Sequence, residues 1–139
     1  MPNKTYPSWS RFLLCEDARA EQNGKHSILG LFAGDNISLV EKIPKGSEFA
    51  VDRICIFIIL KGGVGQFKIG AKFIEPNGKA QLRDLVEDAE MVAGQPCCIN
   101  IRFSPFPMKE LGIYSIELML DDNDSGFKYE FEVKGEFES

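Results

Sequence analysis

The chain has 139 residues, of which 44% are hydrophobic and 27% are charged, and its formal net charge is −5. This balance is typical of a folded globular domain and excludes wholesale disorder. The 16 basic side chains are scattered among 21 acidic ones, which argues against binding to nucleic acid or to an anionic membrane surface.

The amino-terminal segment predicts neither export nor insertion into a membrane. Its first apolar run covers only residues 12–15 and is followed by Glu16 and Asp17, whereas a signal peptide needs an apolar stretch of about 7–15 residues. The longest apolar run in the chain, residues 54–60, is far shorter than the roughly 20 residues that span a bilayer. We therefore expect a cytoplasmic protein whose 4 cysteines are free thiols.

Alternation of apolar and polar residues dominates the rest of the chain. Phe67, Ile69, Ala71 and Phe73, for example, are separated by single polar or small residues, the pattern of a half-buried strand. The strands expected from such patterns and from the turn signals cover residues 9–16, 26–33, 36–40, 50–60, 67–73, 79–86, 99–103, 114–120 and 127–133.

Short turn sequences connect these strands. Hairpin turns are expected at the Pro-Asn-Gly-Lys sequence of residues 76–79, at the glycine-rich residues 61–65 and at residues 123–126. Helix is expected only over residues 17–22 and 84–93. The sequence thus predicts a single all-β domain over residues 1–139, an antiparallel β-sandwich of about eight strands with little helix and an immunoglobulin-like architecture.

Several segments resemble a family of small uncharacterised bacterial β-sandwich proteins, a domain of unknown function. They are the sequences Phe-Leu-Leu-Cys-Glu-Asp-Ala-Arg at residues 12–19 and Asn-Gly-Lys-His-Ser-Ile-Leu-Gly-Leu-Phe at residues 23–32, together with residues 65–69, 75–79 and 111–116. The resemblance implies a β-sandwich, and it carries no known activity or site.

One acidic segment matches a metal-binding pattern. The oxygen-bearing residues Asp121, Asn123, Ser125 and Glu132, with Gly126, fit positions 1, 3, 5, 12 and 6 of an EF-hand calcium loop. An EF-hand needs flanking helices, but the flanks here alternate as strands. We therefore interpret the segment as an acidic hairpin, and a calcium-binding lectin-like module is kept as an alternative.

No pattern in the sequence indicates catalysis or a cofactor. His26 is the only imidazole, and nothing orients Ser8, Ser10 or Ser27 as a nucleophile beside it. The chain has neither a phosphate-binding loop nor zinc-ligand spacing. We predict no catalytic residues and no cofactor. A small hydrolase or lyase that uses dispersed Asp, Glu and His residues is a further alternative.

The segment 54–60 breaks the alternation because both of its faces are apolar. The residues that share one face, Ile54, Ile56, Ile58 and Leu60, are the candidate interface residues. We expect this face to be covered either by the segment around Leu85 and Val92 or by a partner.

The leading hypothesis is a non-catalytic cytoplasmic binding or assembly module, with a protein partner or self-association into an oligomer. Charged substitutions at Ile56 and Phe57 are expected to have different consequences.

Overall fold

The computed structural model describes residues 4–44, 49–51, 53–103, 106–108 and 110–138. In this part the chain forms eleven strands and one short 3-10 turn. The elements are β1 (Trp9–Ala20), η1 (Gln22–Gly24), β2 (His26–Leu31), β3 (Asn36–Ser38), β4 (Phe49–Val51), β5 (Ile54–Lys61), β6 (Gly65–Ile74), β7 (Ala80–Met91), β8 (Cys97–Phe103), β9 (Phe106–Met108), β10 (Gly112–Leu120) and β11 (Asn123–Lys134).

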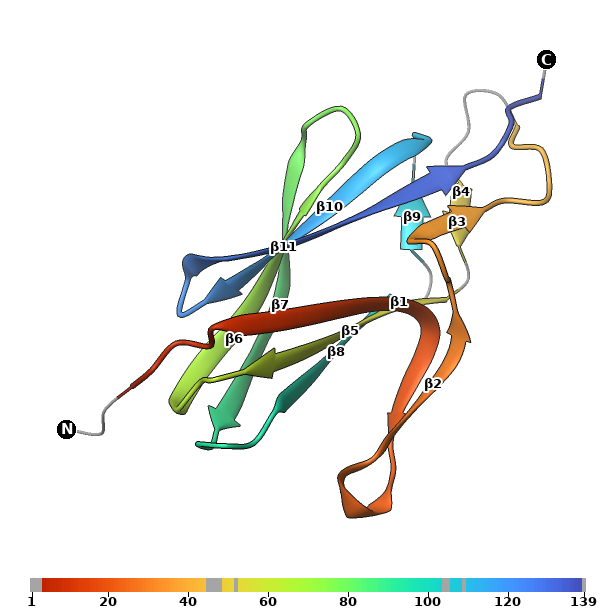
Figure 1. Ribbon diagram of the computed structural model, residues 1–139. Coiled ribbons are helices and arrows are strands. Elements are labelled where there is room, and N and C mark those ends of the chain that lie inside the picture. Colours follow the sequence, from red (N-terminus) through yellow and green to blue (C-terminus); the bar gives the residue numbers. More distant parts are fainter. Residues whose placement is uncertain (1–3, 45–48, 52, 104–105, 109, 139) are drawn as a thin grey trace.

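Two sheets form the body of the molecule. One has the strand order β2-β1-β5-β8 and the other the order β3-β11-β10-β6-β7, and β4 and β9 form a separate two-stranded ribbon. In Figure 1, β10 and β11 lie above β1 and β5, and the core fills the space between the sheets. The prediction of an all-β sandwich is confirmed, and the immunoglobulin-like arrangement stays a prediction.

Aromatic side chains from both sheets meet in this core. Phe103 of β8 contacts Phe73 of β6 and Phe106 of β9, with ring centroids 4.8 and 5.1 Å apart. Phe106 also contacts Tyr114 of β10, whose ring stacks 5.8 Å from that of Phe131. Such edge-to-face and offset pairs add to the stability gained from burial alone. The sequence did not predict β9, which places Phe106 at the centre of this group.

The four candidate interface residues of β5 point into the core. Ile54, Ile56 and Ile58 are 0% exposed and Leu60 is 1% exposed, and all four pack against side chains of the opposite sheet. They therefore offer no surface to a partner, because the second sheet of the same chain already covers them.

The opposite face of β5 is covered by a hairpin that we call the arm, residues 16–31. The first half of β1 pairs with β5 as far as Cys15, and the second half pairs with β2. Figure 1 shows β1 bending sharply where the two halves join. Beyond the bend, Ala18 and Ile28 pack on Cys55 and Phe57 of β5.

Both expected helices are wrong. The backbone at residues 17–20 continues as β1 and the 3-10 turn η1 follows, while residues 80–91 form β7 at the edge of the five-stranded sheet. The segment expected to cover β5 is thus a strand of the other sheet. The side chains of Leu85 and Val86 lie outside what the structure describes.

The turns are only partly as expected. Residues 76–79 connect β6 to β7 in a hairpin, as predicted. Residues 61–65 do not form one, because β5 and β6 belong to different sheets and the glycine-rich segment carries the chain across. The β10–β11 hairpin exists, but its turn residues are Asp121 and Asp122, with φ of 53° and 64°.

Candidate functional site

The seam between the arm and β5 contains two thiols on adjacent strands. Cys15 and Cys55 are direct partners in the β1–β5 register, and both are 0% exposed. The Cys15 thiol donates a hydrogen bond to the Cys55 carbonyl oxygen, with Sγ and O 3.5 Å apart. Burial raises the pKa of Cys15 and raises that of Cys55 to about 12. Both groups are therefore protonated and unreactive at neutral pH.

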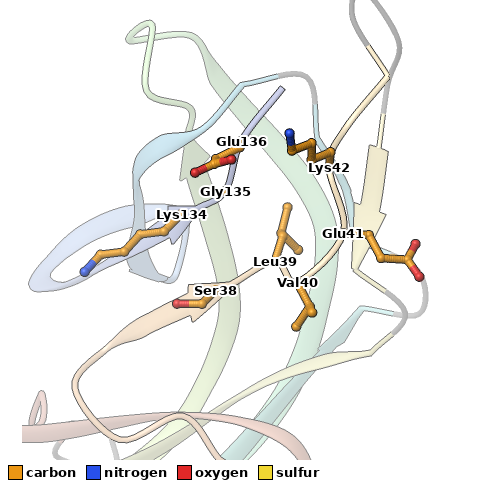
Figure 2. Close-up of a pocket in the computed structure, with 8 residues that line it drawn as sticks. All are labelled: Ser38, Leu39, Val40, Glu41, Lys42, Lys134, Gly135 and Glu136. Carbon is orange, nitrogen blue, oxygen red and sulfur yellow. The ribbon is translucent and has the colours of Figure 1, made fainter. Parts of the chain in front are cut away.

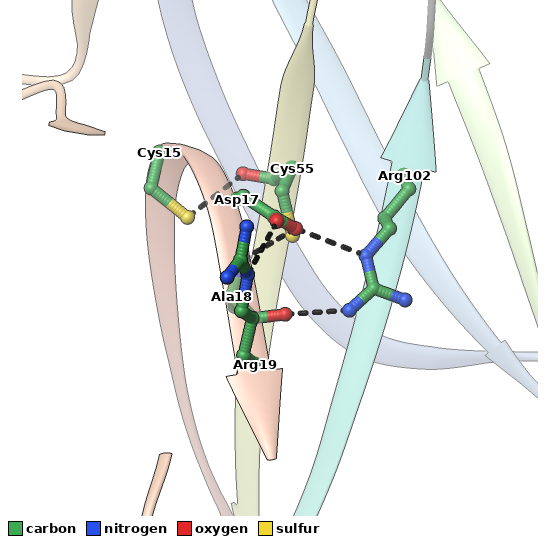
Figure 3. A network of polar contacts seen from close by, with 6 residues as sticks. All are labelled: Cys15, Asp17, Ala18, Arg19, Cys55 and Arg102. Carbon is green, nitrogen blue, oxygen red and sulfur yellow. Dashed lines mark hydrogen bonds and ion pairs between the residues drawn. The ribbon is translucent and has the colours of Figure 1, made fainter. Parts of the chain in front are cut away.

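A charged cluster joins the arm to β8 (Figure 3). The Arg102 guanidinium reaches from β8 to Asp17, with Nε 3.2 Å from Oδ1, and its Nη2 donates to the Ala18 carbonyl oxygen at 2.5 Å. Arg19 on the arm itself donates from Nε to the other Asp17 oxygen at 3.3 Å. Desolvation favours the neutral form of Asp17, but the hydrogen bonds from Arg19 and Arg102 outweigh it, so the pKa of Asp17 is lowered.

Two polar side chains neighbour Phe57. The His26 ring packs against the Phe57 ring with centroids 5.0 Å apart, and Asn100 is the register partner of Phe57 on β8. Nδ1 of His26 and Oδ1 of Asn100 are both buried without a hydrogen-bond partner among the described residues. His26 is thus a packing residue of the arm.

The outer side of the arm exposes apolar side chains at a sheet edge. Leu29 is 42% exposed and Leu31 is 54% exposed, and both belong to β2, which has a neighbour on one side only among the described strands. No Asp, Glu, Lys or Arg occurs in β2. This is an uncharged, apolar strand edge.

A hollow of about 410 Å³ lies at the other end of the molecule, between residues 38–42 and 134–136 (Figure 2). The segment after β3 bulges outward there, and Val40 at the bulge is 99% exposed. Figure 2 shows the Lys134 side chain extending away from the other lining residues, whereas the Lys42 amine is directed toward the side of the hollow where Glu136 lies.

A second hollow, of about 480 Å³, lies beside the start of β6 and the end of β7. Its lining consists of Lys4, Val64, Gly65, Gln66, Glu90, Met91, Val92 and Ala93. Apolar side chains dominate this lining, and Val92 is 46% exposed. No histidine or cysteine contributes to it.

The carboxylate of Asp121, the first residue of the candidate calcium loop, is engaged within the protein. It forms an ion pair with Lys4, accepts a hydrogen bond from the Tyr6 hydroxyl at 3.1 Å and accepts another from the Lys68 backbone N–H at 3.0 Å. The hydrogen bonds from Lys4 and Lys68 lower the pKa of Asp121.

The other three candidate calcium ligands do not converge on it. The Asn123 side chain donates to the Asp121 carbonyl oxygen, and the Ser125 hydroxyl donates to the Leu118 carbonyl oxygen. Glu132 lies near the far end of β11, opposite Ile113, which is roughly 30 Å from the turn along an extended strand. Within the described residues no three His, Cys, Asp or Glu side chains are grouped so that they could hold a metal ion.

A hydrolase or lyase that uses dispersed acidic residues together with His26 would need side chains that lie on different sheets. Glu87, Asp88 and Glu90 are exposed on β7, at the edge of the five-stranded sheet, and His26 is on the arm of the four-stranded sheet.

The part of the chain that the structure describes includes no helix with the length and apolar character needed to cross a membrane.

Sequence reasoning did not identify Arg102 or Gly30 as important. Arg102 is a polar position of the alternating strand 99–103, which places it on the outer face, where it could have indicated a polar contact. Gly30 sits within the alternating strand 26–33, and a glycine inside a strand is a recognised signal of a kink or bulge. Its φ of +63° is consistent with that role at the bend of the arm.

Comparison with known proteins gives a family and distant structural likenesses. The profile of a family of unknown function, DUF6941, matches residues 10–134. No curated protein matches the sequence. Among solved structures, the chain resembles Pseudomonas fluorescens alkylpurine DNA glycosylase AlkC bound to DNA containing an abasic site analog, with 15% identity and a TM-score of 0.48. The match covers 73% of this chain and 28% of that one.

Proposed function

We propose that this chain, which belongs to DUF6941, a family of unknown function, is a non-catalytic binding or assembly module. Its proposed contact site is the outer edge of the arm. The observation that carries the proposal is the exposure of Leu29 and Leu31 on an edge strand that has no charged residue. Exposed edges usually carry charges or prolines that prevent pairing with another chain.

The contrast with the other sheet supports this choice. The edge strand β7 carries the exposed acidic residues Glu87, Asp88 and Glu90, which discourage the approach of another strand. On β2 the outer backbone edge has no neighbouring strand among the described ones, and the side chains of Leu29 and Leu31 are exposed on the same strand. An added strand would bury the leucines and satisfy backbone groups in one step.

The partner that fits this edge is an extended protein segment with apolar residues at alternate positions. Alternate side chains of such a strand lie on the same face as Leu29 and Leu31. A second copy of this chain can supply the segment through its own β2. The net charge of −5 disfavours a nucleic acid as the partner.

We propose that the module is one domain over residues 1–139 and that it acts in the cytoplasm. One core draws side chains from both sheets, which supports the single domain. The four cysteines are free, which supports a reducing compartment.

The test is a double substitution, Leu29→Lys and Leu31→Lys, with Val40→Lys as the matched control. Val40 is 99% exposed and lies outside the arm. Its substitution by lysine therefore replaces an exposed apolar side chain with a charged one away from the proposed contact site. Analytical ultracentrifugation measures self-association, and cross-linking in the native host followed by mass spectrometry measures a foreign partner. Circular dichroism checks that each variant is folded.

The proposal predicts that the double variant loses the wild-type association or cross-link and that Val40→Lys retains it. A wild-type protein that is monomeric and forms no cross-link through the arm would contradict it, as would equal behaviour of the two variants.

A further inference from the structure

The arm packs on its own small cluster and not on the main core. In that cluster Ala18 and Ile28 of the arm pack with Cys15, Cys55 and Phe57, and the partly buried Leu13, Ile59 and Cys98 pack against it. The His26 ring of the arm also contacts the Phe57 ring. Among the described residues, the core between the two sheets includes no side chain from residues 16–31. Elements that bury few side chains and share none with the main core open at lower free energy than the whole domain unfolds.

Two buried polar atoms near Phe57 lack hydrogen-bond partners among the described residues. They are Nδ1 of His26 and Oδ1 of Asn100. A buried polar atom that forms no hydrogen bond disfavours the closed state relative to an open state in which water reaches it.

Arg102 provides the polar link across the seam beneath the arm. Its guanidinium on β8 binds both the Asp17 carboxylate and the Ala18 carbonyl oxygen of the arm, as Figure 3 shows. The Arg102 side chain is 55% exposed, and exposed ion pairs add only modestly to stability. Such a link can be released without disruption of the core.

The arm also has a defined bend. Gly30 on β2 has φ of +63°, and the space where its side chain would be is filled by Glu16 of β1. Both residues lie where β1 stops pairing with β5 and continues to pair with β2. A left-handed glycine at this point allows the hairpin to turn over the face of β5.

We propose that the arm is a latched element that opens as a unit about the Glu16–Gly30 bend, with Arg102 as the latch, while the sandwich stays folded. Opening exposes Phe57 and the Cys15–Cys55 pair. It also changes the position of the β2 edge. The inference does not require that a partner binds that edge.

The cysteines report the opening directly. Cys15 and Cys55 are 0% exposed in the closed state, so an alkylating reagent modifies them only when the arm or the whole domain opens. Iodoacetamide labelling at pH 8, followed by peptide mass spectrometry, gives the rate at each cysteine. Repeating it in low concentrations of urea separates local opening, which depends weakly on urea, from global unfolding, which depends strongly on it.

The variant is Arg102→Gln, and the matched control is Arg19→Gln. Arg19 binds the same Asp17 carboxylate but from within the arm, so its loss leaves the link to β8 intact. We expect Arg102→Gln to accelerate the labelling of Cys15 and Cys55 roughly fivefold to tenfold, because it removes one exposed and one partly buried charge-assisted hydrogen bond. Its urea midpoint and the labelling of Cys97, which packs against the main core, are expected to stay close to wild type, and Arg19→Gln is expected to label at the wild-type rate.

Three results would overturn the inference. Labelling of Cys15 and Cys55 in the wild type with the full urea dependence of global unfolding would show that the arm does not open by itself. A faster rate in Arg102→Gln that is matched by an equal loss of global stability would make Arg102 an ordinary stabilising residue. Equal rates in the two arginine variants would assign the effect to Asp17. Hydrogen exchange over residues 17–31, compared with β6 and β10, provides the same distinction without a chemical label.

Discussion

Glu16 and Gly30 face each other across the bend of the arm, and the side chain of one occupies the space that a side chain on the other would need. A Cβ atom placed on Gly30 would lie 2.7 Å from both Cγ and Cδ of Glu16. Gly30 is also in the left-handed region, with φ of +63°. The bend therefore depends on glycine for its backbone angle, and the Glu16 side chain would have to move to admit any other residue there.

We expect Gly30→Ala to lower the free energy of unfolding by about 2 kcal/mol, from left-handed strain together with displacement of the Glu16 side chain. Gly78→Ala is the matched control, since Gly78 has φ of +87° and nothing within 4 Å of an added Cβ. That control is expected to cost only about 1 kcal/mol. Urea denaturation measures both, and equal costs would show that Glu16 moves aside freely.

Charged substitutions on the two faces of β5 are expected to have different effects. Ile56→Asp places a carboxylate between the two sheets, where no local movement brings it to water, so we expect loss of the fold. Phe57→Asp places it beneath the arm, where opening of the arm restores hydration. We expect that variant to keep a β-type circular dichroism spectrum and a cooperative melt, with a lower Tm and increased association measured by light scattering. If both variants unfold, the arm is an integral part of the folded domain.

Asp121 is expected to make stability depend on pH. The hydrogen bonds from Lys4 and Lys68 lower its pKa in the folded state, so its contribution is present above the unfolded pKa of about 3.9 and is lost as the pH falls through the folded value. Asp121→Asn keeps a residue type that tolerates the φ of 53°. Its Tm should be a few degrees below wild type at pH 7 and should approach wild type near pH 3. Asp88→Asn, an equal charge change on β7, is expected to show no such trend.

Calcium is expected to have little effect on folding. Asp121 is engaged by Lys4 and Tyr6, and Glu132 lies at the opposite end of β11 from the turn. Thermal melts with excess chelator and with millimolar calcium should therefore agree within about 2 °C. A rise of about ten degrees in calcium would show that the hairpin binds the ion in a geometry that this structure does not have.

The sequence by itself determined most of the strands. Phe67, Ile69, Ala71 and Phe73 are 2–3% exposed, as their alternation predicted, and the Pro-Asn-Gly-Lys turn forms its hairpin. These features depend on residues that are near one another in the chain, because the two faces of a strand and the angles of a tight turn are set locally. The helices at residues 17–22 and 84–93 were predicted wrongly because apolar spacings in short segments fit both the helical and the strand period. Pairing of the first segment with β2 and of the second with β6 decided in favour of strand.

Only the tertiary structure decided which element covers each face of β5 and where the glycine-rich segment 61–65 leads. The apolar pattern of residues 54–60 requires a covering on both faces, but many elements could supply it. The opposite sheet covers Ile56, and a hairpin whose Ala18 lies 39 positions before Phe57 in the sequence covers the other face. The same is true of Arg102, whose partner Asp17 is 85 residues away. Contacts at such separations depend on how whole sheets pack, and local periodicity carries no information about them.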